Sequence, residues 1–392
     1  MKILLVHNRY QQIGGEDSVF QADVELIKDA GHQVILYERD NAEIKGYSAT
    51  QRITLFKNTT WSTESQKDVY QILRKEQPQV VHFHNTFPLI SPSAYYACKE
   101  AGVGVVQTLH NYRLLCPNSM FFRDGRICED CLGKLPPWPG VLHACYRGSR
   151  VQTAAVATMI ASHHLLKTWH DQVHVFIALS HFAREKFIQG GLPADKITVR
   201  PNFIYPDPGP KEEEGTFALF VGRLSREKGV STLLKAWQRL EDIRLNIVGD
   251  GPLYGEVQRF VTENKMRHVK VIGHLDRQSI QALYKQARFL IVPSECYENF
   301  PMVIVEAFAC GLPVITTRLG AMQEIVKNEI TGLHFDLSSA EDLAVKIAWL
   351  WSRPEESYRM GLEARKEYEM KYTAQSSYQK LQEIYELAIE RH

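Results

Sequence analysis

CYENFPMVIVEAFACGLPVI, residues 296–315, runs from a loop through a short helix to a strand. Pro301 disfavours helical geometry at the preceding residue but suits the first helical position, so a helix is expected to begin at Pro301 and to end at Gly311. The β-branched run that begins at Pro313, PVITT, is typical of a buried strand. This order of elements predicts one unit of an α/β fold with a parallel sheet.

Two glutamates, Glu298 and Glu306, flank seven residues of this segment. We expect Glu298 in the loop before the helix and Glu306 more than one turn inside it. A carboxylate on a mostly apolar helix needs a partner or a ligand, because an unpaired buried charge is costly. The two glutamates are therefore either a capping acid and a structural ion pair, or acceptors for the vicinal hydroxyl groups of a sugar or ribose.

The same alternation of short β-rich runs and amphipathic helices continues through almost all of the 392 residues. It is interrupted once, by the proline-rich and acidic segment YPDPGPKEEEG at 205–215. A chain of this length exceeds what one hydrophobic core usually supports. We expect two doubly wound parallel-sheet domains, 1–205 and 206–370, facing each other across a cleft, and a C-terminal helix at 371–392 that crosses back to the first domain.

Composition excludes several classes of protein. With 46 basic and 45 acidic residues, the chain is not expected to be a general nucleic-acid binder. The N-terminus, MKILLVHNRY, lacks the features of a signal peptide, and the longest weakly polar run, TAAVATMIA, is too short to span a bilayer. These features predict a cytoplasmic protein, in which seven cysteines point to free thiols or a metal site rather than disulfides.

The second half opens with FVGRLSREKG, residues 220–229, in which Arg223 and Lys228 follow a strand. At this end of a parallel sheet, Arg can fork onto two phosphate oxygens and Lys supplies a point charge. Free amides at the start of the helix at 301 favour an anion by about 0.3 to 1 kcal/mol each. Taken alone, the two cations are equally consistent with solvated loop residues, but together with the helix they indicate a diphosphate site.

The first half offers weaker signals. In HNRYQQIGGEDS, Gly14 and Gly15 separate the first strand from the first helix, which lets a phosphate approach the backbone closely. The motif is not a G-x-G-x-x-G fingerprint, so a dinucleotide site is only weakly indicated. His110 ends the strand in QTLHNYR, although a lone histidine is usually structural. His82 and His84 in VVHFHN indicate a packed or polar wall more than a metal pair.

Taken together, these motifs resemble the retaining glycosyltransferases of family 4, which have the GT-B fold of two Rossmann-like domains. The resemblance covers nearly the whole chain. It departs from the family at Pro301, where many members have Gly, and at 201–204, where PNFI replaces a Pro-Asn-Gly turn. Neither change removes a charge. Its most specific parts are FPMVIVEA between the two glutamates, GRLSREKG, IVGDGP at 247–252 and the N-terminal glycine pair.

The resemblance implies a role for each matching residue. Glu298 would hold hydroxyl groups of the donor sugar, and Glu306 would hold the ribose. Arg223 and Lys228 would neutralise the diphosphate, with Gly15 closing over it from the opposite domain. His110 would lie beside the donor sugar and the incoming acceptor. The implied catalytic set is His110, Arg223, Lys228 and Glu298; the remaining donor contacts are Gly14, Ile272 near the base, and the backbone of Phe300, Met302 and Val303.

The implied reaction transfers a hexose-type sugar from a nucleotide-diphosphate sugar, with UDP favoured, to a hydroxyl of a glycan or lipid-linked glycan. It proceeds with retention and needs no cofactor for catalysis. Two alternatives stay open: a GT-B epimerase or phosphorylase, and a noncatalytic nucleotide-sugar-binding protein. Trp138 and its neighbouring prolines suggest a peripheral membrane contact at a lipid-linked acceptor.

A cysteine-rich loop at 113–150 follows His110 and is expected to shape the acceptor pocket. C-x2-C flanked by two further thiols has the ligand count of a closed tetrahedral zinc site. A loop of this length also needs a cross-link or a bound metal to hold it in place. His143 could replace one thiol. Packing of free thiols and redox or disulfide chemistry are the alternatives. The predicted structural zinc ligands are Cys116, Cys128, Cys131 and Cys145.

Overall fold

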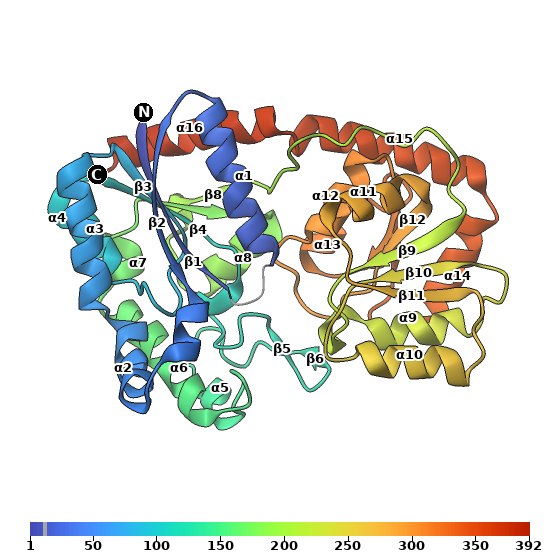
Figure 1. The fold of residues 1–392 in the computed structure, drawn as a ribbon, viewed down its shortest axis with the longest axis horizontal. Coiled ribbons are helices and arrows are strands. Elements are labelled where there is room, and N and C mark those ends of the chain that lie inside the picture. Colours follow the sequence, from blue (N-terminus) through green and yellow to red (C-terminus); the bar gives the residue numbers. More distant parts are fainter. Residues whose placement is uncertain (11–13) are drawn as a thin grey trace. The chain divides into compact units, whose positions relative to one another are not determined.

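The computed structural model describes residues 1–10 and 14–392, and the chain divides into two compact units, each with its own six-stranded sheet (Figure 1). The N-terminal unit comprises Met1–Phe121, Cys128–Asn202 and Ser377–His392. The C-terminal unit comprises Phe122–Ile127 and Phe203–Ser376. Each unit is described by itself below.

The sheet of the N-terminal unit is entirely parallel and has the order β2-β1-β3-β4-β7-β8. Strand order reverses between β1 and β3, and at such a point open α/β sheets bind ligands outside the carboxyl ends of their strands. The apolar run of β1 from Ile3 to Val6 is fully buried, as expected for a strand covered on both faces. The strands are β1 (Lys2–Arg9), β2 (Gln33–Asp40), β3 (Val80–Asn85), β4 (Gly104–Thr108), β7 (Val175–Ala178) and β8 (Ile197–Val199).

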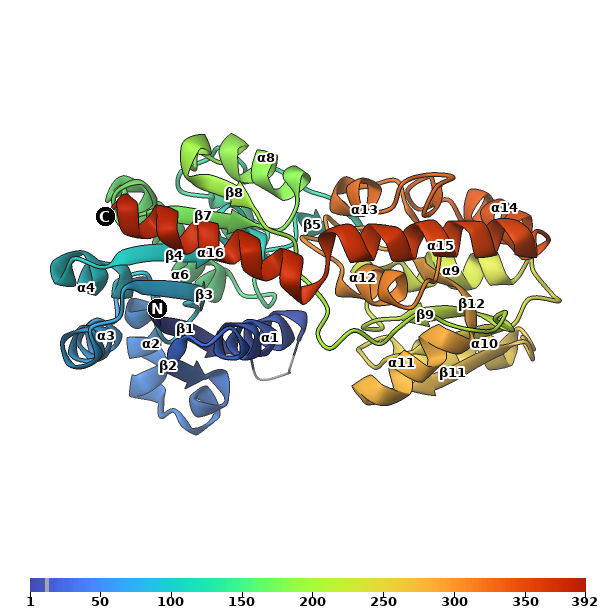
Figure 2. The ribbon, with the colours of Figure 1, turned by 90° about the horizontal axis from the view of Figure 1, so that it is seen from above.

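Helices cover both faces of this sheet, with α1 and α16 together over one of them (Figure 2). Several helices of this unit begin after a serine. Its hydroxyl accepts a hydrogen bond from an amide of the first turn that has no partner within the helix, as Ser149 does for α6. The helices are α1 (Gly15–Asp29), α2 (Ala49–Thr60), α3 (Thr63–Glu76), α4 (Ala94–Ala101), α5 (Trp138–Leu142), α6 (Arg150–Leu165), α7 (Thr168–Asp171), α8 (His181–Gln189) and α16 (Ala374–Glu390).

The C-terminal helix belongs to the N-terminal unit from Ser377 onward. Its Tyr385 hydroxyl lies 2.8 Å from Nδ1 of His82 in β3, and Nε of Arg200 donates to the carbonyl of Ser377 at 3.3 Å. The N-terminal unit ends at Asn202, close to the predicted boundary at 205–206. The predicted first domain also contained the whole cysteine-rich loop, but the hairpin of β5 (Phe122–Arg123) and β6 (Arg126–Ile127) is grouped with the C-terminal unit.

The sheet of the C-terminal unit has the order β11-β10-β9-β12-β13-β14, again parallel throughout, with its reversal between β9 and β12. Its main core packs α9, α10 and α14 on the sheet and includes the buried side chains of Trp237, Ile247 and Ile347. The strands are β9 (Phe217–Val221), β10 (Leu245–Val248), β11 (Val269–Gly273), β12 (Ala287–Val292), β13 (Val314–Thr317) and β14 (Gly332–Phe335). The helices are α9 (Val230–Trp237), α10 (Tyr254–Glu263), α11 (Arg277–Gln286), α12 (Met302–Ala309), α13 (Gly320–Ile325), α14 (Ala340–Trp351) and α15 (Pro354–Lys371).

The segment at 296–315 forms the predicted loop, helix and strand. Helix α12 begins at Met302, with Pro301 in extended geometry as its cap, one residue later than expected. It ends before Gly311, which has φ +68°, in the left-handed region that glycine adopts most readily. The strand that follows is β13.

Candidate functional site

An ion pair lies at the reversal point of the C-terminal sheet. Nζ of Lys228, in the loop after β9, is 2.6 Å from Oε1 of Glu298, in the loop after β12. The same carboxylate oxygen accepts from the hydroxyl of Ser294 at 2.7 Å. The side chains of Lys228 and Glu298 are 29% and 14% exposed, so the pair is held in the protein yet reachable from solvent. This contact joins two residues of the predicted set.

Each partner holds the other in its charged form. Burial works against the ammonium charge of Lys228, but Glu298 more than offsets it, so the pKa of Lys228 is raised. Burial likewise works against the Glu298 carboxylate, but the charge and hydrogen bond of Lys228 prevail and lower the pKa of Glu298. Both groups are therefore ionised at neutral pH.

A glycine allows these two loops to meet. Gly229 has φ +69°, and a β-carbon there would lie 1.8 Å from the carbonyl oxygen of Pro293, the residue that follows β12. Any side chain at this position would push the Lys228 loop away from the Glu298 loop. A similar close approach occurs at Gly249 in the IVGDGP motif, where a β-carbon would lie 1.9 Å from the carbonyl oxygen of Gly222.

Glu306 lies on α12 and binds a different partner. Its Oε2 accepts from the hydroxyl of Tyr284, in α11, at 2.9 Å. Burial raises the pKa of Glu306, while the Tyr284 hydrogen bond acts in the opposite direction. Before α12, the Phe300 ring is mostly buried and meets the Tyr372 ring edge-on at 6.0 Å. The aromatic contact helps to fix the chain that leads into α12.

The other predicted donor contacts of the C-terminal unit come from the same loops and from β11 and α12. Arg223 is exposed, and its side chain makes no hydrogen bond or ion pair with the described residues. Ile272 is half-buried in β11, whereas Met302 and Val303 are half-buried at the start of α12. Arg223 and Lys228 thus come from the loop after β9, and the glutamates from the loop after β12 and from α12.

The predicted glycine pair lies at the start of α1, in the N-terminal unit. Gly14 is the cap of the helix and Gly15 its first residue; residues 11–13 of the same loop lie outside the described residues. Gly14 has φ −124°, which any residue adopts, and no described heavy atom lies within 4 Å of where its β-carbon would be. The described residues therefore do not require a glycine at position 14.

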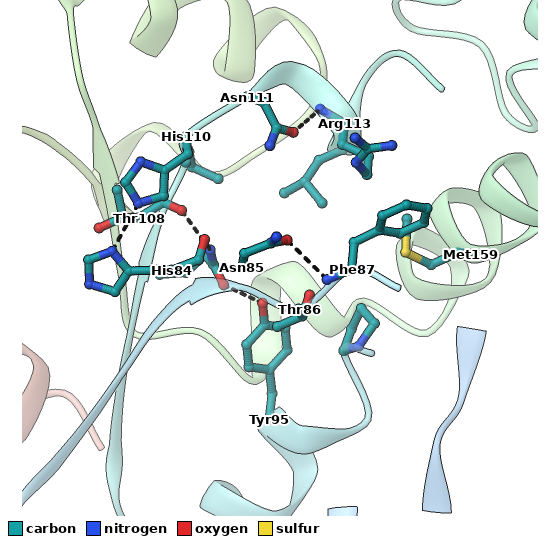
Figure 3. Close-up of a pocket in the computed structure, with 14 residues that line it drawn as sticks. His84, Asn85, Thr86, Phe87, Tyr95, Thr108, His110, Asn111, Arg113 and Met159 are labelled. Carbon is teal, nitrogen blue, oxygen red and sulfur yellow. Dashed lines mark hydrogen bonds between the residues drawn. The ribbon is translucent and has the colours of Figure 1, made fainter. Parts of the chain in front are cut away.

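His110 lies two residues beyond the end of β4, not at its end as expected, and contacts His84 of β3 (Figure 3). Nε2 of His110 is 2.9 Å from Nδ1 of His84, and the two rings stack at 5.1 Å. Nε2 of His84 is 3.8 Å from a carboxylate oxygen of Asp23, which pairs in turn with Arg200. Burial lowers the pKa of His110 to about 3, so the ring is neutral at physiological pH.

Two family models match the chain in succession. The model described as Glycosyltransferase Family 4 matches residues 14–208, and the model described as Glycosyl transferases group 1 matches residues 203–367. Together they span nearly all of both units. The chain belongs to the family 4 glycosyltransferases, with the GT-B fold.

Among curated relatives of this family 4 glycosyltransferase, an uncharacterized glycosyltransferase of Methanocaldococcus jannaschii is 34% identical over 175 residues, 45% of this chain and 49% of the relative. The chain thus spans about half the length of that protein. The GPI3 subunit of phosphatidylinositol N-acetylglucosaminyltransferase from Saccharomyces cerevisiae is 23% identical over 363 residues, 85% of this chain and 71% of the relative.

Solved GT-B structures share the fold of this glycosyltransferase over its full length. HepE of Anabaena in complex with UDP matches with a TM-score of 0.69 and 17% identity, covering 98% of this chain and 99% of that one. Sucrose-phosphate synthase of Thermosynechococcus elongatus matches with a TM-score of 0.73 and 18% identity, covering 100% of both chains.

The zinc site predicted for the cysteine-rich loop of the glycosyltransferase stays a prediction. Across residues 1–10 and 14–392, no three or more His, Cys, Asp or Glu side chains gather closely enough to hold a metal ion. Cys116 and Cys131 are buried, whereas Cys128 and Cys145 are half-buried, and none of the four forms a disulfide with a described cysteine. Burial, with a smaller contribution from Cys116, raises the pKa of Cys131 to about 12, which keeps this thiol protonated.

Sequence reasoning missed the residues that support the site from behind. Ser294 and Tyr284 hold the two glutamates, and Asp23 and Arg200 lie behind His84. The sequence gives no local signal for the Asp23 pairing, since 177 positions separate Asp23 from Arg200. His82 and His84 form the polar wall that was predicted: His82 lies 2.8 Å from the Tyr385 hydroxyl and 2.7 Å from the Thr108 hydroxyl.

Proposed function

We propose that this glycosyltransferase transfers a hexosyl unit from a UDP-sugar to a hydroxyl of a glycan or lipid-linked glycan, with retention of anomeric configuration. The observation that supports this proposal most directly is the Lys228–Glu298 ion pair at the reversal point of the C-terminal sheet. An ionised pair there offers a cation for phosphate beside a carboxylate for sugar hydroxyls. The UDP complex of the structurally similar HepE is consistent with the choice of nucleotide.

In the proposed donor complex, Arg223, Lys228 and the amides at the start of α12 carry the diphosphate. The exposed guanidinium of Arg223 is available to fork onto two phosphate oxygens without first breaking a contact to a described residue. Glu298 accepts from hydroxyl groups of the sugar, and Glu306 from the ribose. Ile272 lies against the base, and the backbone of Phe300, Met302 and Val303 lies along the sugar and phosphate.

The proposed reaction loosens the bond between the anomeric carbon and the phosphate oxygen until the sugar has oxocarbenium character. The bound cations and amides stabilise the negative charge that develops on the leaving diphosphate, and removing one such donor typically costs about 2.7 to 4 kcal/mol of transition-state stabilisation. The departing phosphate oxygen takes the proton of the acceptor hydroxyl on the same face, which gives retention without a protein nucleophile. His110 acts on the acceptor side as a neutral hydrogen-bonding group.

Proton NMR of UDP-sugars incubated with the enzyme tests this proposal, because slow transfer to water needs no knowledge of the acceptor. We expect UDP release and a sugar product that first appears as the α-anomer from an α-linked donor. A β-anomer appearing first would contradict retention. Sugar epimerised on intact UDP would indicate an epimerase, phosphate-dependent sugar 1-phosphate a phosphorylase, and UDP binding without turnover in any acceptor screen a sensor.

We also propose that the enzyme contacts the cytoplasmic face of a membrane through α5 and the start of α6. Leu135, Trp138, Leu142 and Val151 are 44%, 54%, 52% and 69% exposed, an unusual concentration of apolar surface. Residues 132–170 contain no Asp or Glu, and Nζ of Lys134 lies 5.3 Å from the Trp138 ring centre. Exposed Trp and Leu beside basic residues suit an anionic lipid surface.

Vesicle flotation tests the membrane contact. Wild-type protein should float with vesicles that contain phosphatidylglycerol and stay behind with pure phosphatidylcholine, whereas Trp138→Ser with Leu142→Ser should reduce flotation. Leu362→Ser, at an exposed leucine of α15, is the matched control. Equal flotation of both variants would contradict the proposal. Within the described residues, none of the helices combines the length and apolar character needed to cross a membrane.

A further inference from the structure

A small pocket opens at the carboxyl ends of β3 and β4 in the N-terminal unit (Figure 3). Its walls include Asn85 at the end of β3 and Phe87 just after it, and His110 and Arg113 from the chain after β4. Arg113 belongs to the short helical turn η2 (Tyr112–Leu114). This turn therefore carries a permanent cation to the edge of the sheet where the strand order places ligands.

The guanidinium of Arg113 has donors that the described protein leaves unused. It stacks over Phe87, with its central carbon 4.1 Å from the ring centre. Nη2 reaches the Ser119 hydroxyl only at 3.5 Å, and the guanidinium lies near enough to the Tyr10 hydroxyl to act against the rise of its pKa. Nε and Nη1 are inaccessible to solvent and make no hydrogen bond of good geometry with the described residues. Buried donors without partners are costly, most of all on a charged group, so this arrangement favours a ligand that satisfies them.

The acidic groups near Arg113 do not neutralise it. These groups are the Glu16 carboxyl and the Tyr10 hydroxyl. The side-chain amide of Asn111 donates to Glu16 Oε2 at 3.2 Å and to the Tyr10 hydroxyl at 3.4 Å. Burial raises the pKa of Glu16 to about 8 and raises the pKa of Tyr10, although Arg113 itself acts in the opposite direction on both. Both groups are thus mainly neutral at pH 7, and Arg113 makes no ion pair with the residues that the structure describes.

We propose that Nε and Nη1 of Arg113 bind an oxyanion, either phosphate or carboxylate, that the acceptor substrate carries near its reacting hydroxyl. A guanidinium binds either group through two parallel hydrogen bonds. The Phe87 ring stacked against the Arg113 guanidinium keeps its plane in a fixed orientation. The assignment to the acceptor rests on the proposed function, since the candidate donor residues Lys228, Glu298 and Glu306 belong to the other unit. The acceptor is therefore an acidic molecule rather than a neutral sugar.

Thermal unfolding of the UDP-saturated protein tests the site with inorganic phosphate and, separately, acetate, each against chloride at equal ionic strength. Saturating UDP keeps phosphate out of the diphosphate site. Phosphate or acetate should raise the melting temperature of the wild type, and Arg113→Gln should weaken that binding about tenfold, as expected for a lost charged hydrogen bond. Arg74→Gln, at an exposed arginine of α3, is the matched control and should respond like the wild type.

Each outcome has one meaning. A larger response to phosphate identifies a phosphorylated acceptor, and a larger response to acetate identifies an acidic glycan. Equal responses of Arg113→Gln and wild type would overturn the proposal. If that variant does not fold, the Nε–H resonances of the wild type in a 1H–15N spectrum replace it, and no shift of any of them with phosphate or acetate would overturn the proposal. A protein that fails to bind UDP refutes the proposed function instead, while the anion titrations still report on Arg113.

Discussion

Lys228 and Glu298 meet at 2.6 Å although 70 positions separate them in the sequence. The loops that carry them follow β9 and β12, which are neighbours at the reversal point of the sheet. The pair holds its two charges in place before any ligand arrives, so less ordering remains to be done when a diphosphate sugar binds. Because of the same contact, the charge of each residue is stabilised by the other.

Replacing Lys228 with Met should destabilise the protein and weaken UDP binding. The change leaves the Glu298 carboxylate partly buried without its counter-ion, so we expect the free energy of unfolding to fall by about 1 to 3 kcal/mol. UDP affinity should fall about tenfold with the loss of a charged hydrogen bond. Urea unfolding and calorimetric titration measure the two effects.

A second substitution distinguishes the effect of the ion pair on stability from its effect on UDP binding. Adding Glu298→Gln to Lys228→Met removes the stranded charge and should restore part of the unfolding free energy but not the affinity for UDP. Identical urea midpoints for wild type and Lys228→Met would show that the pair contributes nothing to stability.

Replacing Glu306 with Ala should remove discrimination for the ribose hydroxyl groups. We expect the wild type to bind UDP more tightly than its 2′,3′-dideoxy analogue by about tenfold, because the analogue leaves a carboxylate acceptor without its donors. In Glu306→Ala the two ligands should bind equally. Tyr284→Phe removes the 2.9 Å hydrogen bond to Glu306 but keeps the carboxylate, and it should retain the preference for UDP. A preference that persists in full in Glu306→Ala would refute the ribose assignment.

Much of the fold follows from the sequence because its signals are local. Pro301 and Gly311 bracket α12, which starts one residue after the proline and ends two residues before the glycine, and the β-branched run after Pro313 is β13. The glycines of the GRLSREKG and IVGDGP motifs also mark the places where one loop must approach another, since Gly229 and Gly249 leave no room for a β-carbon.

The rest of the site depends on contacts between distant segments. The chain gives no periodic signal that Asp23 of α1 will pair with Arg200 after β8, or that a hairpin at 122–127 will leave the unit that surrounds it in the sequence. The cysteine spacing predicted four ligands around one ion, but spacing does not fix the direction of the thiols, and the structure brings no three of them close enough.

Metal analysis of the purified protein tests whether the cysteine-rich loop binds zinc. The zinc hypothesis predicts about one zinc per chain and a lower melting temperature after chelation, because a structural site contributes directly to folding free energy. Cys131→Ser should then release the metal, whereas Cys98→Ser, at a buried cysteine outside the loop, should not. Less than one zinc per chain under careful handling, together with free thiols that titrate after unfolding, would favour thiol packing instead.

The buried histidines of the N-terminal unit should make the protein acid-labile. Burial lowers the pKa of His82, His84 and His110 below the value of 6.5 for an exposed imidazole, so between pH 6.5 and the folded pKa the unfolded chain binds more protons than the native one. Stability is therefore highest above about pH 7 and falls as the pH drops, by about 1.4 kcal/mol per pH unit for each such group. For His110 this loss continues to about pH 3.

Urea unfolding at pH 7.5 and at about pH 5.5 measures this dependence. His84→Gln cannot take up a proton in the unfolded state, so its loss of stability between the two pH values should be smaller than that of the wild type by about 1 kcal/mol. His143→Gln, at an exposed histidine of the same unit, should behave like the wild type. The amide that His84→Gln introduces can either donate to or accept from Nε2 of His110, so the variant should keep the neutral ring in place and remain active near pH 7.5. Equal pH dependence in all three proteins would mean that His84 takes up its proton at the same pH in the folded and the unfolded chain, and would contradict a neutral His84 held by burial.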